Sequence, residues 1–368
     1  MRIAIAINTS WNIYNFRAGL IRALLDQKHE VIAIAPRDEY SQKLIDMGCS
    51  FYPVEISGTG TNPFADFKLF LTLKRLYSDI RPDIIYQYTV KPNIYGSFAA
   101  RTLGIPVINN VSGLGTVFLN KGIAPKIAKK LYKWSFRKVN LIFFQNGDDQ
   151  RDFLNQVPLP EVRSEVIPGS GINLEHFRAK HTLSTPPCRF LMISRLILDK
   201  GILEYLDAAR AIRKQYPQTE FQLLGQLDEN HARGLKKELL DTYINDGSIQ
   251  YLGTDDAVQT HIDLATCVVL PSYREGTPKT LLEAAAMSRP IITTDAPGCR
   301  EVVLDGQNGY LCQVKSSTDL QHKIRKIIDM NPTDLQKMGT CGRLMVEKKF
   351  DEQIIIQKYI SETHKILD

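Results

Sequence analysis

Two glutamates eight residues apart, Glu275 and Glu283, are the first side chains here whose spacing could serve chemistry. An apolar run, Cys267–Leu270, predicts a buried strand before them, and Lys279–Met287 predicts a helix. Pro278 suits the first turn of that helix because it has no N–H to leave unpaired. Backbone N–H groups at a helix start favour an anion. The residues predicted to line this anion site are Gly276, Thr277, Pro278, Lys279 and Thr280.

A second stretch, residues 190–201, carries two cations at a predicted strand-to-helix turn. Arg195 leaves the strand, and Lys200 stands just before the helix. Cations in this position can hold a diphosphate. The two carboxylates, in turn, can accept hydrogen bonds from hydroxyl groups. The two stretches together therefore indicate a ligand that carries both a diphosphate and sugars, and a sugar nucleotide has both features.

A metal site is not indicated. The six Cys are scattered without a Cys-x-x-Cys pair, and the seven His show no His-x3-His spacing. The acidic pairs at 148–149 and 255–256 fall where helices are predicted to begin, where carboxylates favour the helix dipole. We therefore expect no metal or other cofactor, and reduced thiols typical of a cytoplasmic protein.

The basic charge of the chain lies in its first half. Residues 1–170 hold 21 Lys and Arg against 14 Asp and Glu, and residues 171–368 hold 25 against 26. This fits contact with phosphate head groups or a lipid diphosphate. Nucleic acid is not expected, because no basic–aromatic recognition motif appears. No apolar run approaches the roughly 20 residues that span a bilayer, and the first residues lack signal-peptide architecture.

The length suggests two domains, and strands alternate with helices throughout. We predict an α/β protein with two Rossmann-like, doubly wound domains that face a central cleft. The predicted parts are a first domain over residues 1–168, a linker over 169–188, a second domain over 189–350 and a C-terminal helix over 351–368 that returns to the first domain. Within the first domain, residues 8–15 are expected to form a loop and Phe16–Gln27 a helix.

The text PSYREGTPKTLLEAAAMSRPII and the pattern Ser-Arg-x4-Lys-Gly that ends at Gly201 resemble glycosyltransferase family 4, the retaining enzymes of GT-B fold. The resemblance covers nearly the whole chain. It implies that Arg195 and Lys200 bind the donor diphosphate, that Glu283 accepts from the ribose hydroxyls, and that Glu275 lies near the donor sugar. In such enzymes a donor phosphate oxygen takes the acceptor's proton. Glu275 is therefore not assigned as a covalent nucleophile, although glycosidase logic would suggest it.

The first domain is similar to one branch of that family, the bacterial N-acetylgalactosaminyltransferases that extend undecaprenyl-diphosphate-linked sugars. The segments that carry the likeness are Asn-Ile-Tyr-Asn-Phe-Arg17 and Lys91-Pro-Asn-Ile-Tyr-Gly96. It implies a UDP-sugar donor and a polyprenyl-diphosphate acceptor. Many relatives place a His near the donor sugar, but residues 105–120 contain none, and Asn110 or the Ser112–Gly113 backbone could substitute. The residues proposed for acceptor binding are Asn15, Arg17, Lys91 and Gly113.

Residues 124–138 predict a basic amphipathic helix. One face carries cations, and Ile127, Leu131 and Trp134 occupy another. This pattern favours contact with an anionic membrane surface, and a core-packed helix with a solvated basic face is the alternative. With a lipid acceptor, we expect a cytoplasmic protein attached peripherally to the inner face of the cytoplasmic membrane. The cations of this helix are Lys126, Lys129, Lys130, Lys133 and Arg137.

Two other classes of function remain open on the sequence alone. One is a sugar-nucleotide epimerase of the same fold, which would need acid and base groups in the cleft. The other is a non-catalytic protein that binds a sugar nucleotide or a glycan. The favoured hypothesis is a retaining hexosyltransferase that moves a hexose or N-acetylhexosamine, with N-acetylgalactosamine preferred. The donor sugar, the linkage and the acceptor sugar are not specified by these motifs.

Overall fold

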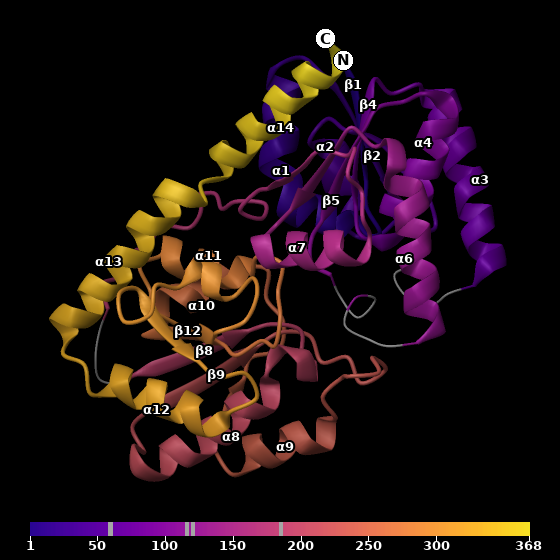
Figure 1. The fold of residues 1–368 in the computed structure, drawn as a ribbon. Coiled ribbons are helices and arrows are strands. Elements are labelled where there is room, and N and C mark those ends of the chain that lie inside the picture. The colour runs from indigo at the N-terminus through magenta and orange to yellow at the C-terminus, as the bar shows by residue number, and fades with distance from the viewer. Residues whose placement is uncertain (58–61, 115–117, 119–121, 184–186) are drawn as a thin grey trace. The chain divides into compact units, whose positions relative to one another are not determined.

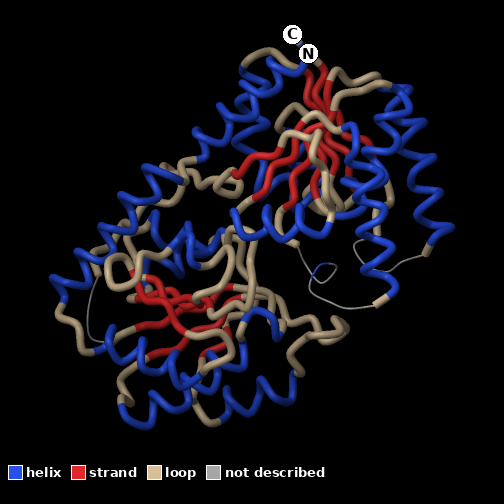
Figure 2. The backbone as a smooth tube through the Cα atoms, in the orientation of Figure 1, coloured by secondary structure: helices blue, strands red, loops and turns tan. Residues whose placement is uncertain are grey.

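The structure is a computed structural model that describes residues 1–57, 62–114, 118, 122–183 and 187–368. The chain divides into two units, one formed by Met1–Ser170 with Glu352–Asp368 and the other by Gly171–Asp351. Each unit has its own parallel sheet with helices on both faces (Figure 2). The predicted α/β class with two doubly wound domains is confirmed.

The sheet of the first unit has the order β3-β2-β1-β4-β5-β6-β7, and every pair of neighbours is parallel. The order reverses between β1 and β4, so their carboxyl ends form a topological switch point, where ligands bind in open α/β sheets. The strands are β1 (Arg2–Ala6), β2 (Glu30–Ala35), β3 (Ser50–Pro53), β4 (Ile84–Tyr88), β5 (Val107–Val111), β6 (Leu141–Phe144) and β7 (Ser164–Val166).

Alternation along β1 explains how helices cover both faces of this sheet. Ile3 and Ile5 join the core beneath one set of helices, and Ala4 and Ala6 join the core beneath the other. The first set is α1 (Ser10–Asp26), α2 (Ser41–Asp46) and α14 (Glu352–Leu367), and the second is α3 (Pro63–Ile80) and α4 (Ser97–Leu103). A further cluster joins α6 (Ile123–Ser135) and α7 (Gly147–Gln156), and a π-helix spans Pro92–Gly96.

Helix α1 begins at Ser10, so the prediction of a loop over residues 8–15 was wrong. Thr9 caps the helix, and its side chain accepts a hydrogen bond from the Asn12 N–H at 3.1 Å. Ile13 is fully buried in the core of the unit. Capping and burial therefore outweigh the modest helix propensity of Trp, Asn, Ile and Tyr in this stretch. As a result Asn15 and Arg17 lie on a helix.

The C-terminal helix α14 belongs to the first unit and runs beside α1 (Figure 1). Its Tyr359 is buried against Tyr86 and Phe143, with ring centroids 5.0 Å apart in each case. Tyr86 and Thr363 share a hydrogen bond of 2.5 Å between their hydroxyl oxygens. Glu362 is fully buried and forms an ion pair of 2.6 Å with Arg163, the residue before the edge strand β7. Apolar packing and ion pairs thus fix the end of the chain to the first sheet.

The sheet of the second unit has the order β10-β9-β8-β11-β12-β13 and is also parallel throughout. Its switch point lies between β8 and β11. The strands are β8 (Arg189–Ile193), β9 (Glu220–Leu224), β10 (Gln250–Tyr251), β11 (Cys267–Leu270), β12 (Ile291–Thr294) and β13 (Gly309–Cys312). The helices are α8 (Ile202–Gln215), α9 (Lys237–Asn245), α10 (Val258–Leu264), α11 (Lys279–Ala286), α12 (Ser317–Ile328) and α13 (Pro332–Lys349).

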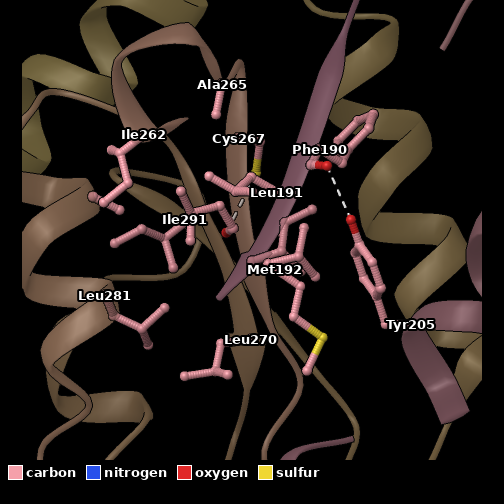
Figure 3. Packing of buried hydrophobic residues seen from close by; sticks show 14 of the residues in the cluster. Phe190, Leu191, Met192, Tyr205, Ile262, Ala265, Cys267, Leu270, Leu281 and Ile291 are labelled. Atoms are coloured by element: carbon pink, nitrogen blue, oxygen red, sulfur yellow. Dashed lines mark hydrogen bonds between the residues drawn. The ribbon is translucent and has the colours of Figure 1, made fainter. Parts of the chain in front are cut away.

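The two central strands of this sheet form the middle of its core (Figure 3). Leu191 of β8 and Val268 of β11 are register partners and are fully buried. Tyr205 of α8 closes one side, and its hydroxyl donates to the Phe190 carbonyl oxygen at 2.9 Å. Leu281 of α11 packs in the same cluster. The helix that follows each central strand is therefore held rigidly against the sheet.

The predicted linker over residues 169–188 needs correction. From Gly171 on, this segment belongs to the second unit, and Ile172 and Phe177 are buried in its core. The Ile172 N–H also donates to the Phe350 carbonyl oxygen at 2.8 Å. Its Gly and Pro content suggested a linker, but these two apolar anchors attach it. Residues 184–186, part of the same prediction, lie outside the described residues.

Candidate functional site

Two loops leave the adjacent carboxyl ends of β8 and β11 and touch each other. Gly201 has φ +72°, and a Cβ at this position would lie 2.0 Å from the Pro271 carbonyl oxygen. The Tyr273 N–H donates to the Asp199 carbonyl oxygen at 2.9 Å. Only glycine fits at the first contact, because both the backbone conformation and the close approach exclude a side chain. The sequence stretches 190–201 and 271–283 are thereby brought together as one site.

An ion pair joins the two loops. Lys200 Nζ lies 2.5 Å from Glu275 Oε1, and the two side chains are 22% and 13% exposed. The Glu275 N–H donates to the Pro297 carbonyl oxygen at 3.0 Å. Gly298, with φ +82°, lies so close that a Cβ there would be 2.1 Å from the Glu275 carbonyl oxygen. Glu275 is therefore fixed from both sides of its backbone and through its carboxylate.

Arg195 is placed differently from Lys200. It follows β8 and is exposed, and its guanidinium forms no ion pair within the described part of the chain. Its carbonyl oxygen accepts from the Ile197 N–H at 2.8 Å, which closes the turn toward Lys200. An unneutralised cation at a switch point suits an anionic ligand.

Glu283 is almost completely buried on α11. Burial raises the pKa of its carboxyl group, and nearby Lys279 partly offsets the increase. Lys279 Nζ lies 3.5 Å from Glu283 Oε1. His176, from the segment predicted as a linker, also acts to lower the pKa of this carboxyl group. A buried carboxylate in this setting can accept hydrogen bonds from hydroxyl groups of a ligand.

The start of α11 is built into the same site. Pro278 occupies the N-cap, and its carbonyl oxygen accepts from the Leu281 N–H at 3.1 Å. Gly276 and Pro278 are buried, and Thr277 is half-buried. The Thr280 hydroxyl donates to the Ile193 carbonyl oxygen at 3.3 Å, which attaches the first turn to the end of β8. All predicted donor-site residues therefore lie within these two loops and the helix that follows them.

Two further polar pairs flank this site, and the sequence reasoning did not find them. The Tyr273 hydroxyl donates to Glu204 Oε1 at 2.8 Å, and Arg233 pairs with Asp199 at 2.8 Å. Glu204 is on α8 and Arg233 precedes α9, so each pair joins residues more than thirty positions apart. No local spacing signals such pairs, because the fold alone brings them together.

The four acceptor candidates lie in the first unit, in different environments. Arg17 on α1 is buried, and Asn15 donates to the Trp11 carbonyl oxygen at 3.0 Å. Lys91 pairs with Asp66 at 2.8 Å, and both side chains are at most 15% exposed. Gly113 follows β5 with φ +125°. Lys91 is therefore neutralised by the protein, whereas Arg17 shows no carboxylate partner in the described ranges.

Among the residues that the structure describes, no group of three or more His, Cys, Asp or Glu side chains could hold a metal ion. Within the same residues, none of the helices has the length and apolar character required to cross a bilayer.

Comparison with known proteins matches both units. Residues 174–345 match the family model described as "Glycosyl transferases group 1", and residues 2–146 match "Glycosyl transferase 4-like". A Campylobacter jejuni protein is 30% identical over 384 aligned positions, which cover 100% of this chain and 99% of the relative. It is named N,N'-diacetylbacillosaminyl-diphospho-undecaprenol alpha-1,3-N-acetylgalactosaminyltransferase. An Escherichia coli UDP-Gal:alpha-D-GlcNAc-diphosphoundecaprenol alpha-1,3-galactosyltransferase is 24% identical over 289 positions, 72% of this chain and 71% of its own.

Solved structures show the same fold. A glycosyltransferase from Rickettsia africae superimposes with a TM-score of 0.81 at 18% identity, covering 100% of this chain and 98% of its own. Anabaena HepE, crystallised in complex with UDP-glucose, has a TM-score of 0.79 at 16% identity and covers 99% of each chain. These likenesses support the fold that the sequence resemblance implied.

Proposed function

This chain belongs to the glycosyltransferases of the group 1 and family 4 type, and we propose that it transfers a hexose or N-acetylhexosamine from a UDP-sugar to an undecaprenyl-diphosphate-linked glycan. N-acetylgalactosamine is the favoured sugar, because the relative that matches the whole chain carries that name. The reaction retains the anomeric configuration and uses no metal. It serves the assembly of bacterial surface polysaccharide or glycoprotein glycans.

The observation that carries this proposal is the charge arrangement at the β8–β11 switch point. Arg195 and Lys200 follow β8, and Glu275 holds Lys200 through an ion pair. Glu283 is buried on α11, the helix that follows Glu275. In the proposed complex, Arg195 and Lys200 bind the donor diphosphate and the Gly276–Thr280 segment faces the β-phosphate. Glu283 accepts from the ribose hydroxyls. The matched family region covers all of these residues.

Catalysis in this proposal is electrostatic. Negative charge develops on the leaving UDP, and Arg195 and Lys200 stabilise it from fixed positions. A donor phosphate oxygen takes the proton of the attacking acceptor hydroxyl, so Glu275 is a positioning group for Lys200 and contacts the donor sugar. Removing one preorganised contact of this kind typically costs on the order of 3 kcal/mol of barrier. In this proposal Arg195 supplies charge compensation for which other enzymes use a metal ion, and the paired Lys200 donates hydrogen bonds from a fixed position.

The acceptor binds in the first unit, in this proposal near Asn15, Arg17 and Gly113. The location is supported by the unneutralised Arg17 at the β1–β4 switch point. Lys91 contributes through its ion pair with Asp66, whose other oxygen accepts from the Tyr95 hydroxyl at 2.9 Å. This pairing fixes the segment that follows β4.

Two helices of the first unit support peripheral attachment to the inner face of the cytoplasmic membrane. On α6, Ile127 is 52% and Trp134 is 55% exposed beside the lysines of the basic face. On α3, Phe64 is 89% and Phe67 is 61% exposed, a feature that the sequence reasoning missed. Both helices pack on the Pro92–Gly96 segment. Exposed aromatic rings beside cations suit the headgroup region of an anionic bilayer.

Transfer can be tested directly. The purified chain is incubated with a panel of UDP-sugars and a short polyprenyl-diphosphate-linked acceptor, with and without a chelator. The product is analysed by mass and by anomeric configuration. We expect a single added sugar with the donor's configuration and no effect of the chelator. An inverted product, or release of UDP without an acceptor-linked product, would overturn the proposal.

A further inference from the structure

The first unit contains a cation that its surroundings leave without a counter-ion. Arg17 is 6% exposed, and its Cζ lies 4.2 Å from the centroid of the Tyr88 ring. Its Nη1 donates to the Phe16 carbonyl oxygen at 2.8 Å, and no carboxylate pairs with it in the described ranges. Lys91, which follows the same strand as Tyr88, is in contrast neutralised by Asp66. A buried and unpaired charge is costly, so this position suits an anionic ligand.

Three buried hydrogen-bond donors lie on Arg17 and on the two residues where β4 ends. Arg17 Nε, Tyr88 Oη and Thr89 Oγ1 are inaccessible to solvent and make no hydrogen bond to the described residues. Burial raises the pKa of the Tyr88 hydroxyl, and Arg17 and Tyr359 partly offset the increase. The hydroxyl is not in hydrogen-bond geometry with either residue. Unsatisfied buried polar atoms are rare in folded proteins and call for a partner. A phosphate group carries several oxygens that can accept hydrogen bonds from donors of these types.

The position of these donors in the fold is that of a ligand site. Arg17 lies on α1, which follows β1, and Tyr88 ends β4 with Thr89 directly after it. β1 and β4 are the two neighbours at the switch point of the first sheet. Thr89 has φ +63°, which is unfavourable for a β-branched residue. Such strain is typically retained where it positions a functional group.

The wall behind the site comes from β5 and the C-terminal helix. The Asn110 side-chain amide donates to the Tyr359 hydroxyl at 3.1 Å, and the Tyr359 ring lies 6.4 Å from the Tyr88 ring. Tyr359 is thereby held in position behind Tyr88.

We propose that Arg17, Tyr88 and Thr89 form a phosphate-binding pocket at the β1–β4 switch point, which holds a phosphate group of the lipid-linked acceptor. The identity of the ligand rests on the proposed function, whereas the pocket itself does not. Lys91 is a positioning residue outside the pocket. The second switch point, at β8 and β11, binds the donor diphosphate, so each unit binds its own phosphate group.

Inorganic pyrophosphate serves as the probe, in the full-length chain saturated with UDP so that the second unit is occupied. Calorimetry is expected to show pyrophosphate binding that persists under these conditions. Arg17→Gln and Thr89→Val should weaken it at least tenfold while the affinity for UDP is unchanged. Loss of all pyrophosphate binding in the presence of UDP would overturn the pocket, as would unchanged binding in Arg17→Gln.

Thr89→Gly separates ligand binding from structure. Glycine relieves the left-handed strain, so the melting temperature should rise by about 3 °C, while pyrophosphate binding weakens with loss of the hydroxyl. Lys28→Gly is the matched control, because Lys28 is exposed and has φ +62° in the same unit. It should raise the melting temperature without changing pyrophosphate affinity. Unchanged affinity in Thr89→Gly would contradict the proposal. Pyrophosphate binding without sugar transfer would contradict the proposed function and leave the phosphate-binding pocket supported.

Discussion

Lys200 and Glu275, seventy-five positions apart, form an ion pair with 2.5 Å between Nζ and Oε1. The pair connects the loop after β8 to the loop after β11, and both side chains are largely buried. Lys200 is therefore in place before a ligand arrives. Arg195, which is exposed on the same loop, is available to close on the ligand. Fixed charge of this kind costs no reorganisation at the moment of reaction.

Replacing Lys200 by Met should lower the kcat/KM of sugar transfer by about 10²- to 10³-fold, because one preorganised charge at the leaving group is lost. Steady-state kinetics with the acceptor at saturation measures this effect. Lys337→Met is the matched control, since Lys337 lies in the same unit, is 73% exposed and pairs with Asp334 on the protein surface. Equal rates for the two variants would contradict the role given to Lys200.

The affinity for UDP should fall on acidification, starting above the ordinary Glu pKa. Burial raises the pKa of Glu283, so on acidification the ionised carboxylate proposed to accept from the ribose is lost at a higher pH than in an exposed Glu. Calorimetric titration between about pH 5 and 8 tests this. Glu283→Gln should bind UDP about tenfold more weakly and remove most of this pH dependence. A wild-type affinity that stays constant down to pH 5 would refute the assignment.

The same substitution should stabilise the ligand-free protein at neutral pH. The raised pKa of Glu283 means that the folded state holds its proton more tightly than the unfolded state. The stability of the wild type therefore decreases as the pH rises from the ordinary Glu pKa through the folded-state pKa. Glu283→Gln should melt at a higher temperature than the wild type at pH 7, with the difference vanishing toward pH 4. Thermal melts at both pH values would reveal a lower or equal midpoint if this is incorrect.

Acid should destabilise the first unit through Glu362. Burial opposes its ionisation, but hydrogen bonds from Lys365, Arg163 and Lys358 outweigh burial and lower its pKa to about 2. The stability that this group contributes is complete above the ordinary Glu pKa of 4.5 and is lost as the pH falls toward 2. We expect this contribution to the free energy of unfolding to be about 2 kcal/mol, less than the full pKa difference would give, because solvent screens the exposed partners of Glu362.

Glu362→Gln should remove that contribution at pH 7, as measured by denaturant unfolding, with little further loss at low pH. Glu347→Gln is the comparison variant, because Glu347 forms a similar i,i+4 pair with Arg343 but is 42% exposed. It should change the free energy of unfolding by less than about 0.5 kcal/mol. Similar losses in both variants would show that burial of Glu362 is not the cause.

Membrane attachment should depend on the exposed rings of α3. Phe64→Glu combined with Phe67→Glu should reduce flotation with vesicles rich in anionic lipid several-fold, because the rings no longer enter the interface and the new charges are repelled. Leu344→Glu is the control, since Leu344 is 60% exposed but lies in the second unit. High salt should weaken binding of the wild type. Flotation that is unaffected by the Phe substitutions would refute this surface.

The parts of the candidate site at the β8–β11 switch point could be recognised because each of them is local in sequence. Each stretch consists of a strand, a turn and the start of a helix, and its cations, carboxylates and backbone amides indicate an anionic ligand with hydroxyl groups. The pairing partners could not be predicted, because Lys200 meets Glu275 and Lys91 meets Asp66 only through the fold. Whether a cation is neutralised, as Lys91 is, or left unpaired, as Arg17 is, depends on such contacts.

The two structural errors have a common cause. Residues 8–15 were predicted as a loop and 169–188 as a linker from local propensity and Gly or Pro content. In each case buried apolar side chains, Ile13 in the first and Ile172 and Phe177 in the second, attach the segment to a core. Tertiary packing overrode the local preference.

Helix α14 carries a practical consequence for anyone who divides this protein. A fragment that stops at Ser170 would expose apolar surface of its core where Ile355, Ile356 and Tyr359 pack in the full chain. Such a fragment should aggregate on expression unless residues 352–368 are supplied, either as a separate peptide or as a fusion after Ser170. Removing the last seventeen residues of the whole chain would damage the half that begins it.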